Sequence, residues 1–263
     1  MVKANPKIIV ILGQTASGKS DLAIKLAKKY DGEIISADSR QVYRGMDLGT
    51  GKLARDKKQD TRNKNLFISG GVKHYLIDIS NPGTEYNVSN FKKDAEKIIT
   101  DILQRGKLPI ICGGIGFWIS AIVDNKIFPE VKPNKKLRET LTKKSAEQLF
   151  LMLKKLDPER AKSIDQHNKV RLIRAIEICK ELGKVPNSTS CSSPFKGEGL
   201  GGVNFLQIGI DVLKEKLHKN IKTRLEKRFK AGLIKEVENL HKKYATQGES
   251  WIPFNPVQRS FFC

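Results

Sequence analysis

A phosphate-binding loop is the feature of this sequence with the most direct chemical meaning. Residues 13–20 match the pattern Gly-x-x-x-x-Gly-Lys-Ser/Thr in full. The glycines let backbone N–H groups curl around phosphate oxygens, Lys19 supplies a point charge, and the Ser20 hydroxyl can ligate Mg²⁺. We expect every residue of the loop to contact a di- or triphosphate: Gly13, Gln14, Thr15, Ala16, Ser17, Gly18, Lys19 and Ser20.

The residues that flank this loop must form the elements that position it. Residues 7–12 are a short, continuous and β-branched apolar run, which predicts a buried parallel strand. From Ser20 to Lys29 apolar residues recur at helical spacing, so a helix should follow. A strand before the loop and a helix after it are the context in which this pattern binds phosphate, because the helix N-terminus favours negative charge.

A carboxylate follows the second predicted strand. Residues 33–37 predict a buried strand, and Asp38 comes directly after it. Ligands of doubly wound sheets bind at the carboxyl ends of the strands. Asp38 would therefore face the phosphates, where it could ligate a metal or accept a proton. The alternative is an aspartate that only forms a turn.

Strands and helices alternate through the first part of the chain. Residues 74–79 and 108–112 predict strands, and residues 88–103 predict a helix with Ser89 as its N-cap. Residues 205–210 predict a last strand. This alternation favours an α/β fold, a P-loop NTPase-like core with a mostly parallel sheet.

The pattern changes after Phe117. Residues 135–183 lack strand patterns and predict helices, whereas 187–202 predict a loop and 213–244 one long helix. The helix signals are a capping box, an Asp-Pro start and a glycine stop: Ser145 with Gln148, Asp157 with Pro158, and Gly183. We therefore predict three segments: 1–116, the first part of the core; 117–203, a helical basic insert; and 204–263, a return to the core with an atypical tail.

Composition narrows the classes of protein further. The chain has 263 residues with 49 Lys+Arg and 28 Asp+Glu, a formal net charge of +21. Such an excess favours a polyanionic partner, although a solubilising surface is the alternative. No apolar run is long enough for a membrane span or a signal peptide, which predicts a cytoplasmic protein. The four cysteines form no Cys-x-x-Cys pair, so we expect them reduced and structural.

The sequence resembles the tRNA dimethylallyltransferase family from about residue 7 to about residue 244. Its most diagnostic segment is 35–52, Ile-Ser-Ala-Asp-Ser-Arg-Gln-Val-Tyr-Arg-Gly-Met-Asp-Leu-Gly-Thr-Gly-Lys, which follows the phosphate loop. Shorter matches are 74–79, 88–91, 113–114 and 170–177.

The resemblance implies a reaction. A dimethylallyl group would pass from dimethylallyl diphosphate to N6 of the adenine 3′-adjacent to the anticodon in tRNA, releasing diphosphate. Lys19, Ser20 and Mg²⁺ would stabilise charge that develops on the leaving group. The loop threonine of the family corresponds to Thr15, a second contact of the leaving group. Asp38 would take the proton of the adenine amine.

The family also carries an active-site arginine on the last long helix. The alignment of the Gly232-Leu233 segment with the family pattern places it at Arg224, or at Arg228 if the register slips by one turn. An exposed helix arginine without a role is the alternative.

The resemblance places one set of residues at the tRNA, whose target adenine must leave its stack. Arg171 and Arg174 are three apart and share a helix face; a solvated face is the alternative. Ile115 stands where the family usually has Thr, and Trp118 replaces a usual Tyr and would keep an aromatic surface. The implied tRNA-binding residues are Asp38, Ser39, Arg40, Gln41, Ile115, Val170, Arg171, Leu172, Ile173 and Arg174.

The last segment departs from the family pattern. Residues 251–263 do not match it, so we expect a shortened chain, monomeric and weakly active or inactive. Three other functions stay open: a tRNA- or phosphate-binding remnant that has lost catalysis, a P-loop small-molecule kinase, and prenyl transfer to a free adenine nucleotide.

Overall fold

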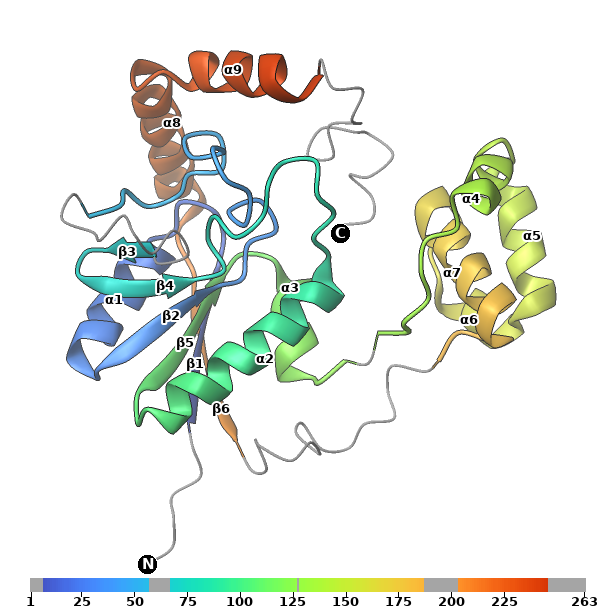
Figure 1. Ribbon diagram of the computed structural model, residues 1–263, viewed down its shortest axis with the longest axis horizontal. Helices are drawn as coiled ribbons and strands as arrows, with labels where there is room; N and C mark the ends of the chain where they lie inside the picture. Colours follow the sequence, from blue (N-terminus) through green and yellow to red (C-terminus); the bar gives the residue numbers. More distant parts are fainter. Residues whose placement is uncertain (1–6, 57–66, 127, 187–202, 246–263) are drawn as a thin grey trace, which may run out of the picture. The chain divides into compact units, whose positions relative to one another are not determined.

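The strands that the structure describes form one six-stranded sheet (Figure 1). The computed structural model describes residues 7–56, 67–126, 128–186 and 203–245. The strands are β1 (Lys7–Gly13), β2 (Gly32–Ser36), β3 (Phe67–Ser69), β4 (Val72–Tyr75), β5 (Leu108–Gly113) and β6 (Asn204–Ile210). The helices are α1 (Lys19–Lys29), α2 (Val88–Gln104), α3 (Gly116–Val123), α4 (Lys135–Thr142), α5 (Ala146–Leu156), α6 (Pro158–Ser163), α7 (Lys169–Leu182), α8 (Lys214–Lys230) and α9 (Leu233–Ala245).

The sheet has the order β3-β4-β2-β5-β1-β6, and all of its pairs are parallel except the β3–β4 hairpin. The prediction of a mostly parallel α/β sheet is confirmed. The bounds of the predicted strand 74–79 are wrong, because β4 begins at Val72 and ends at Tyr75. Leu76 and Asp78 then adopt positive φ angles of 60° and 56°, which end the extended conformation.

Helices cover both faces of the sheet. On one face, α1 packs through Ala23 and Ala27 on strand residues that include Ile34. On the other face, α2 and α3 pack together, with the rings of Phe91 and Trp118 stacked at 4.6 Å. Trp118 is 1% exposed, so the expected aromatic surface at this position is wrong: the indole is a core side chain.

Two helix boundaries differ from the prediction. The N-cap of α2 is Asn87 rather than Ser89, because the Asn87 side chain accepts from the backbone N–H groups of Ser89 and Asn90. The predicted long helix 213–244 is two helices: α8 ends at Lys230, and Gly232 has φ 99°. A left-handed residue interrupts the α-helix, and glycine adopts that conformation without steric cost.

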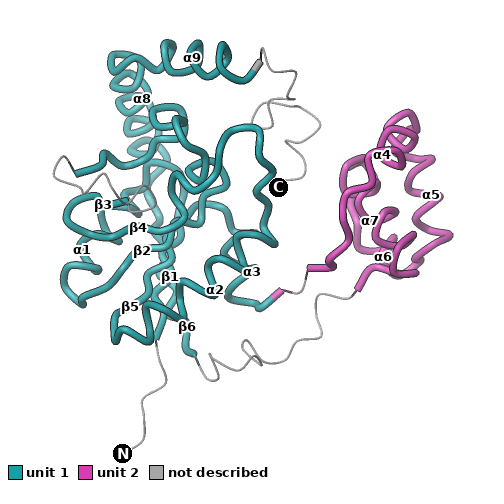
Figure 2. Tube along the Cα trace, viewed as in Figure 1, with its two compact units in different colours: residues 1–125, 193–253 teal, residues 126–192, 254–263 magenta. Residues whose placement is uncertain are grey.

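The described residues divide into two compact units (Figure 2). Unit 1 holds the sheet with α1–α3, α8 and α9; unit 2 holds α4–α7. The first boundary follows Asn125 rather than residue 116, because α3 packs on α2. The second boundary, placed at residue 193, lies outside the described residues, as do the predicted loop 187–202 and the tail 251–263.

The described part of unit 2 consists of four helices around an apolar core of their own, which includes Leu149, Leu153 and Leu172. The helix signals predicted for it are confirmed: the capping box at Ser145 and Gln148, the N-cap Asp157 before Pro158, and the C-cap Gly183. In the described part of the chain, we find no helix with the length and apolar character that a membrane span requires.

Candidate active site

A cavity of about 650 Å³ opens at the carboxyl ends of β1, β2 and β5, where α/β sheets bind their ligands. Residues of the phosphate loop, the β2 and β5 ends and α8 line it. Of the predicted site residues, the cavity brings together Thr15, Ala16, Ser17, Gly18, Lys19, Ser20, Asp38, Gln41 and Arg224. The sheet and α8 thus place the loop, the candidate base and the candidate arginine around one cavity.

The phosphate loop connects β1 directly to α1. Lys19 is half-buried, and its ammonium donates to the carbonyl oxygen of Gln14 at 2.5 Å, which bends the side chain over the loop. Burial lowers the pKa of Lys19 and nearby Arg224 also lowers it, whereas Cys112 and Asp38 act in the opposite direction. An anionic ligand at the loop would therefore stabilise the charged form of Lys19.

Asp38 both forms a turn and lines the cavity. One carboxylate oxygen, Oδ1, accepts from the backbone N–H groups of Arg40 at 2.9 Å and Gln41 at 3.4 Å. The Gln41 side chain is held in turn by the Ser36 hydroxyl, which donates to its Oε1 at 3.1 Å. The two interpretations of Asp38 are therefore compatible, because the turn fixes the direction of the carboxylate while the residue stays in the cavity wall.

Helix α8 closes one side of the cavity. The Asn220 side chain donates to the carbonyl oxygen of Ala16 at 3.2 Å, and the Arg224 guanidinium donates to the carbonyl oxygen of Gly51 at 2.8 Å. Asn220, Arg224 and Arg228 are successive at intervals of four and so share one helix face. Burial lowers the pKa of Arg228 and Arg224 adds to this, with Glu236 opposing.

The position of the two arginines depends on Gly51. Its φ is 65°, and a Cβ there would lie 2.7 Å from the Arg224 Nη2 and would overlap the Arg228 guanidinium. Only glycine fits both the backbone conformation and the close approach of these side chains. Arg224 lines the cavity and Arg228 does not.

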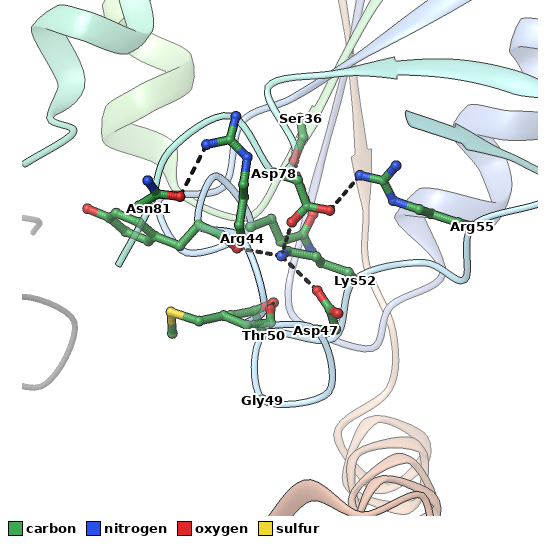
Figure 3. Close-up of polar contacts among 12 residues, drawn as sticks. Ser36, Arg44, Asp47, Gly49, Thr50, Lys52, Arg55, Asp78 and Asn81 are labelled. Atoms are coloured by element: carbon green, nitrogen blue, oxygen red, sulfur yellow. Dashed lines mark hydrogen bonds and ion pairs between the residues drawn. The ribbon is translucent and has the colours of Figure 1, made fainter. Parts of the chain in front are cut away.

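The turn 46–52 that carries Gly51 is fixed by a buried cation (Figure 3). The Lys52 side chain is 2% exposed, and its ammonium donates to Tyr43 O at 2.5 Å, to Asp47 Oδ1 at 2.9 Å and to Asp78 Oδ1. The other Asp78 oxygen accepts from Arg55 at 2.7 Å. All three ammonium protons thus have acceptors, which buried charges require.

Three predicted residues near the loop lie outside the cavity wall. Ser39 is buried, Arg40 is exposed, and Ile115 is the N-cap of α3, half-buried against the α2–α3 core. Gly13 and Gln14 also lie outside it, although Gln14 holds Lys19 through its carbonyl oxygen.

The predicted tRNA-binding stretch of α7 lies in unit 2. Leu172 and Ile173 are core residues of that unit, so their side chains serve packing. Arg174 is half-buried: it donates to Val131 O at 2.9 Å and to Glu177 Oε2 at 3.3 Å. Val170 is half-buried and Arg171 is exposed, which leaves Arg171 as the member of this stretch with an exposed cationic side chain.

Several cavity residues were not predicted, of which His74 is the most unusual. It is 3% exposed, and its Nε2 is without a hydrogen-bond partner among the described residues. Burial lowers the pKa of His74 to about 4, with a hydrogen bond to Ser69 and the charge of Asp56 opposing. The other unpredicted residues of the cavity wall include Thr50, Leu53, Ile77, Cys112, Asn220 and Lys227. For Asn220, the one-turn spacing to Arg224 was an available signal.

The donors at the cavity suit a metal that is shared with a phosphate. Among the residues that the structure describes, no group of three or more His, Cys, Asp or Glu side chains could hold a metal by itself. Mg²⁺ is commonly bound by one or two protein oxygens together with substrate phosphates and water. The Ser20 hydroxyl and the Asp38 carboxylate, both in the cavity wall, provide oxygens of that kind.

These features define a class: an α/β protein whose phosphate-binding loop faces a carboxylate and an arginine across a single cavity. The family model for IPP transferase matches residues 41–258. The chain belongs to the IPP transferase family, and its core has the P-loop-like fold of that family.

The chain is similar to curated relatives over most of its length. It is 41% identical over 237 residues to a tRNA dimethylallyltransferase from Caldicellulosiruptor saccharolyticus, covering 89% of this chain and 72% of that protein. It is 40% identical over 240 residues to a tRNA dimethylallyltransferase from Acetivibrio thermocellus, covering 89% and 71%.

Solved structures agree with this assignment. A full-length tRNA isopentenylpyrophosphate transferase from Bacillus halodurans matches with a TM-score of 0.57 and 32% identity, over 91% of this chain and 71% of that one. A eukaryotic dimethylallyltransferase acting on tRNA matches with a TM-score of 0.70 and 24% identity, over 92% and 57%, which shows the shared fold.

Proposed function

We propose that this protein transfers a dimethylallyl group from dimethylallyl diphosphate to N6 of the adenine 3′-adjacent to the anticodon in tRNA. The observation that carries the proposal is the single cavity lined by Lys19, Asp38 and Arg224. The names of the curated relatives support the reaction type. A kinase would use the same loop, but neither those names nor the family match favours one.

The leaving diphosphate binds at the loop. Backbone N–H groups at the start of α1, the Lys19 ammonium and the Arg224 guanidinium provide positive charge where negative charge develops as the C–O bond breaks. Mg²⁺, held by Ser20 together with the diphosphate, would neutralise further charge on the leaving group. These contacts strengthen in the transition state, which is the condition for raising turnover.

Asp38 acts as the general base. The adenine amine attacks the dimethylallyl carbon while diphosphate departs, and the amine proton passes to the carboxylate. Its Oδ1 is occupied by the turn, so Oδ2 is the oxygen that would take the proton. Thr15, in the cavity wall, is a further contact of the diphosphate.

The tRNA partner accounts for the charge of the chain. A net charge of +21 suits a polyanion, and Arg171 on α7 has the exposure that a phosphate contact needs. Extrusion of the adenine from its stack costs a few kcal/mol, which backbone contacts away from the base must offset.

Nucleoside mass spectrometry tests the function. The purified chain, dimethylallyl diphosphate, Mg²⁺ and unmodified tRNA should yield N6-dimethylallyladenosine and stoichiometric diphosphate. Parallel reactions with adenosine monophosphate, and with ATP labelled on the γ-phosphate, test prenyl transfer to free nucleotide and kinase activity. Product from either of these and none from tRNA would overturn the proposal, and tRNA binding with no product from any substrate would favour the non-catalytic remnant.

A further inference from the structure

Figure 3 shows the ion pair between Lys52 and Asp78. This ion pair connects the turn that holds Arg224 with the segment that holds Asp38. Lys52 stands 26 residues before Asp78, and neither residue touches the phosphate loop through any contact described above. Each of them, however, is connected through backbone hydrogen bonds to one functional side chain of the cavity. Lys52 is connected to Arg224, and Asp78 is connected to Asp38.

The first connection leads from Lys52 to Arg224. The turn 46–52 is closed by three internal hydrogen bonds: Gly51 N to Leu48 O at 3.2 Å, Lys52 N to Asp47 O at 3.0 Å, and Thr50 Oγ1 to Met46 O at 2.5 Å. Lys52 ties this closed turn to Asp78 and to Tyr43 O. Gly51 then offers its carbonyl oxygen to Arg224. The position of the guanidinium therefore follows the position of the turn.

The second connection leads from Asp78 to Asp38. The backbone N–H of Asp78 donates to Gln41 O at 3.1 Å, and the backbone N–H of Gln41 donates to Asp38 Oδ1 at 3.4 Å. Asp78 adopts a left-handed backbone conformation with φ 56°. Its N–H and its carboxylate are consequently used by two different segments, the Asp38 turn and the Lys52 turn.

A second anchor holds the same turn from outside. The Glu236 carboxylate of α9 accepts from the backbone N–H groups of Asp47, Leu48 and Gly49 at 3.1, 2.8 and 2.9 Å. The turn is thus fixed at Lys52 by Asp78 and Tyr43 O, and at residues 47–49 by α9. A shift of this turn would move the Gly51 carbonyl oxygen, which accepts from Arg224.

We propose that Lys52 and Asp78 are positioning residues for dimethylallyl transfer, which set the leaving-group arginine Arg224 and the base Asp38 in register across the cavity. This inference rests on the proposed function, since it assigns diphosphate to Arg224 and the amine proton to Asp38. Lys52 acts through Arg224, so removing Lys52 has little further effect where Arg224 is already absent.

A double-mutant cycle on diphosphate binding tests the connection to Arg224. Lys52→Met keeps the length of the side chain and leaves Asp78 paired with Arg55. Titration calorimetry with inorganic diphosphate and Mg²⁺ should show about tenfold weaker binding for Arg224→Ala, as expected for one charge-assisted contact. Binding should be about three- to tenfold weaker for Lys52→Met, and Lys52→Met in the Arg224→Ala background should add less than about twofold.

Lys92→Met is the matched control. Lys92 is also a paired and largely buried lysine of unit 1, but it bonds Glu96 and Asn125 and does not line the cavity. It should leave diphosphate affinity unchanged. In steady-state assays Lys52→Met and Asp78→Asn should lower kcat and raise KM for dimethylallyl diphosphate, with KM for tRNA unchanged.

The outcomes separate this inference from the proposed function. If Lys52→Met weakens diphosphate binding by the same factor with and without Arg224, the inference is wrong while the function stands. If Arg224→Ala itself leaves diphosphate affinity unchanged, Arg224 does not bind the leaving group. That result contradicts the proposed role of Arg224, and the inference that rests on it is then wrong as well. Should Lys52→Met not unfold cooperatively, Asp78→Asn, which keeps the volume of the side chain, takes its place in the cycle, and additivity there overturns the inference equally.

Discussion

Arg224 on α8 and Arg174 on α7 each belong to a pair of arginines at helical spacing, but their surroundings differ. On α8, Arg224 is held by a backbone carbonyl oxygen, and in the described part of the chain no carboxylate is within ion-pair distance of it. On α7, Arg174 is held by the Val131 carbonyl oxygen and by Glu177, a carboxylate 1% exposed.

The difference lies in what already neutralises each charge. Glu177 also receives a bidentate pair of hydrogen bonds from Arg138, both at 2.7 Å, and one from the backbone N–H of Asn134. Burial opposes ionisation of Glu177, but these donors outweigh it and hold its pKa below the usual value. Arg174 is therefore part of a structural network, whereas Arg224 retains a net positive charge for an anionic ligand.

The largest effect is expected at the centre of the unit 1 cavity. Asp38→Asn keeps the turn, because the amide oxygen can still accept from Arg40 and Gln41, but removes the base. Turnover should fall by roughly 10²–10⁴, measured as N6-dimethylallyladenosine formed at saturating substrates. tRNA affinity should stay within about twofold of the wild type; unchanged turnover would make Asp38 a turn residue only.

The next effect concerns the loop cation opposite Arg224. Lys19→Ala removes a charge-assisted contact worth about 1.5–3 kcal/mol, so diphosphate affinity should fall at least about tenfold. Calorimetry with inorganic diphosphate measures it, with Lys25→Ala on the same helix as the control because Lys25 does not line the cavity. A folded variant with wild-type affinity would contradict the role given to the loop.

In unit 2 the comparison predicts a loss of stability instead of a loss of diphosphate binding. Arg174→Ala leaves the Val131 carbonyl oxygen without this donor and removes one partner of Glu177, which should cost about 1–3 kcal/mol of unfolding free energy. Chemical denaturation followed by circular dichroism measures this. Diphosphate affinity should not change, and a variant of full stability with weaker diphosphate binding would reverse the assignment.

For Arg171, in contrast to Arg174, we expect the main effect on tRNA binding. Arg171→Glu reverses the charge of an exposed side chain of unit 2. Its tRNA affinity should fall several-fold, and the slope of log affinity against log salt should become shallower by about 1. The salt titration is the decisive measurement, because a loss of affinity with an unchanged slope would exclude a phosphate contact.

The smallest effect at neutral pH comes from the buried His74 of unit 1. Its pKa is about 4 in the folded protein against 6.5 for the free side chain. The unfolded state therefore binds more protons between these values, and unfolding free energy should fall as the pH is lowered from about 6.5 to about 4. His74→Gln should reduce this slope, whereas His167→Gln, at an exposed site in unit 2, should not.

The contiguous features were determined by the sequence alone. The loop 13–20 needs only neighbouring residues to form, and the capping box at Ser145 and the helix stop at Gly183 depend on interactions within one turn. Short apolar runs likewise predicted the strands that pair in parallel, although the bounds predicted for β4 were wrong. The break of the long helix also has a local cause, Gly232, but the apolar period from Leu213 to Phe229 favoured a single helix.

Only the tertiary structure decided which charges face the cavity. The acceptor of Arg224 is Gly51, which is 173 residues away in the sequence, and the fixing of that turn depends on Lys52, Asp78 and Glu236 from three separate segments. The charge of an arginine is the same wherever it stands, but its role depends on whether a carboxylate lies within reach. Helical spacing fixes which side chains share a face, and long-range packing fixes what that face meets.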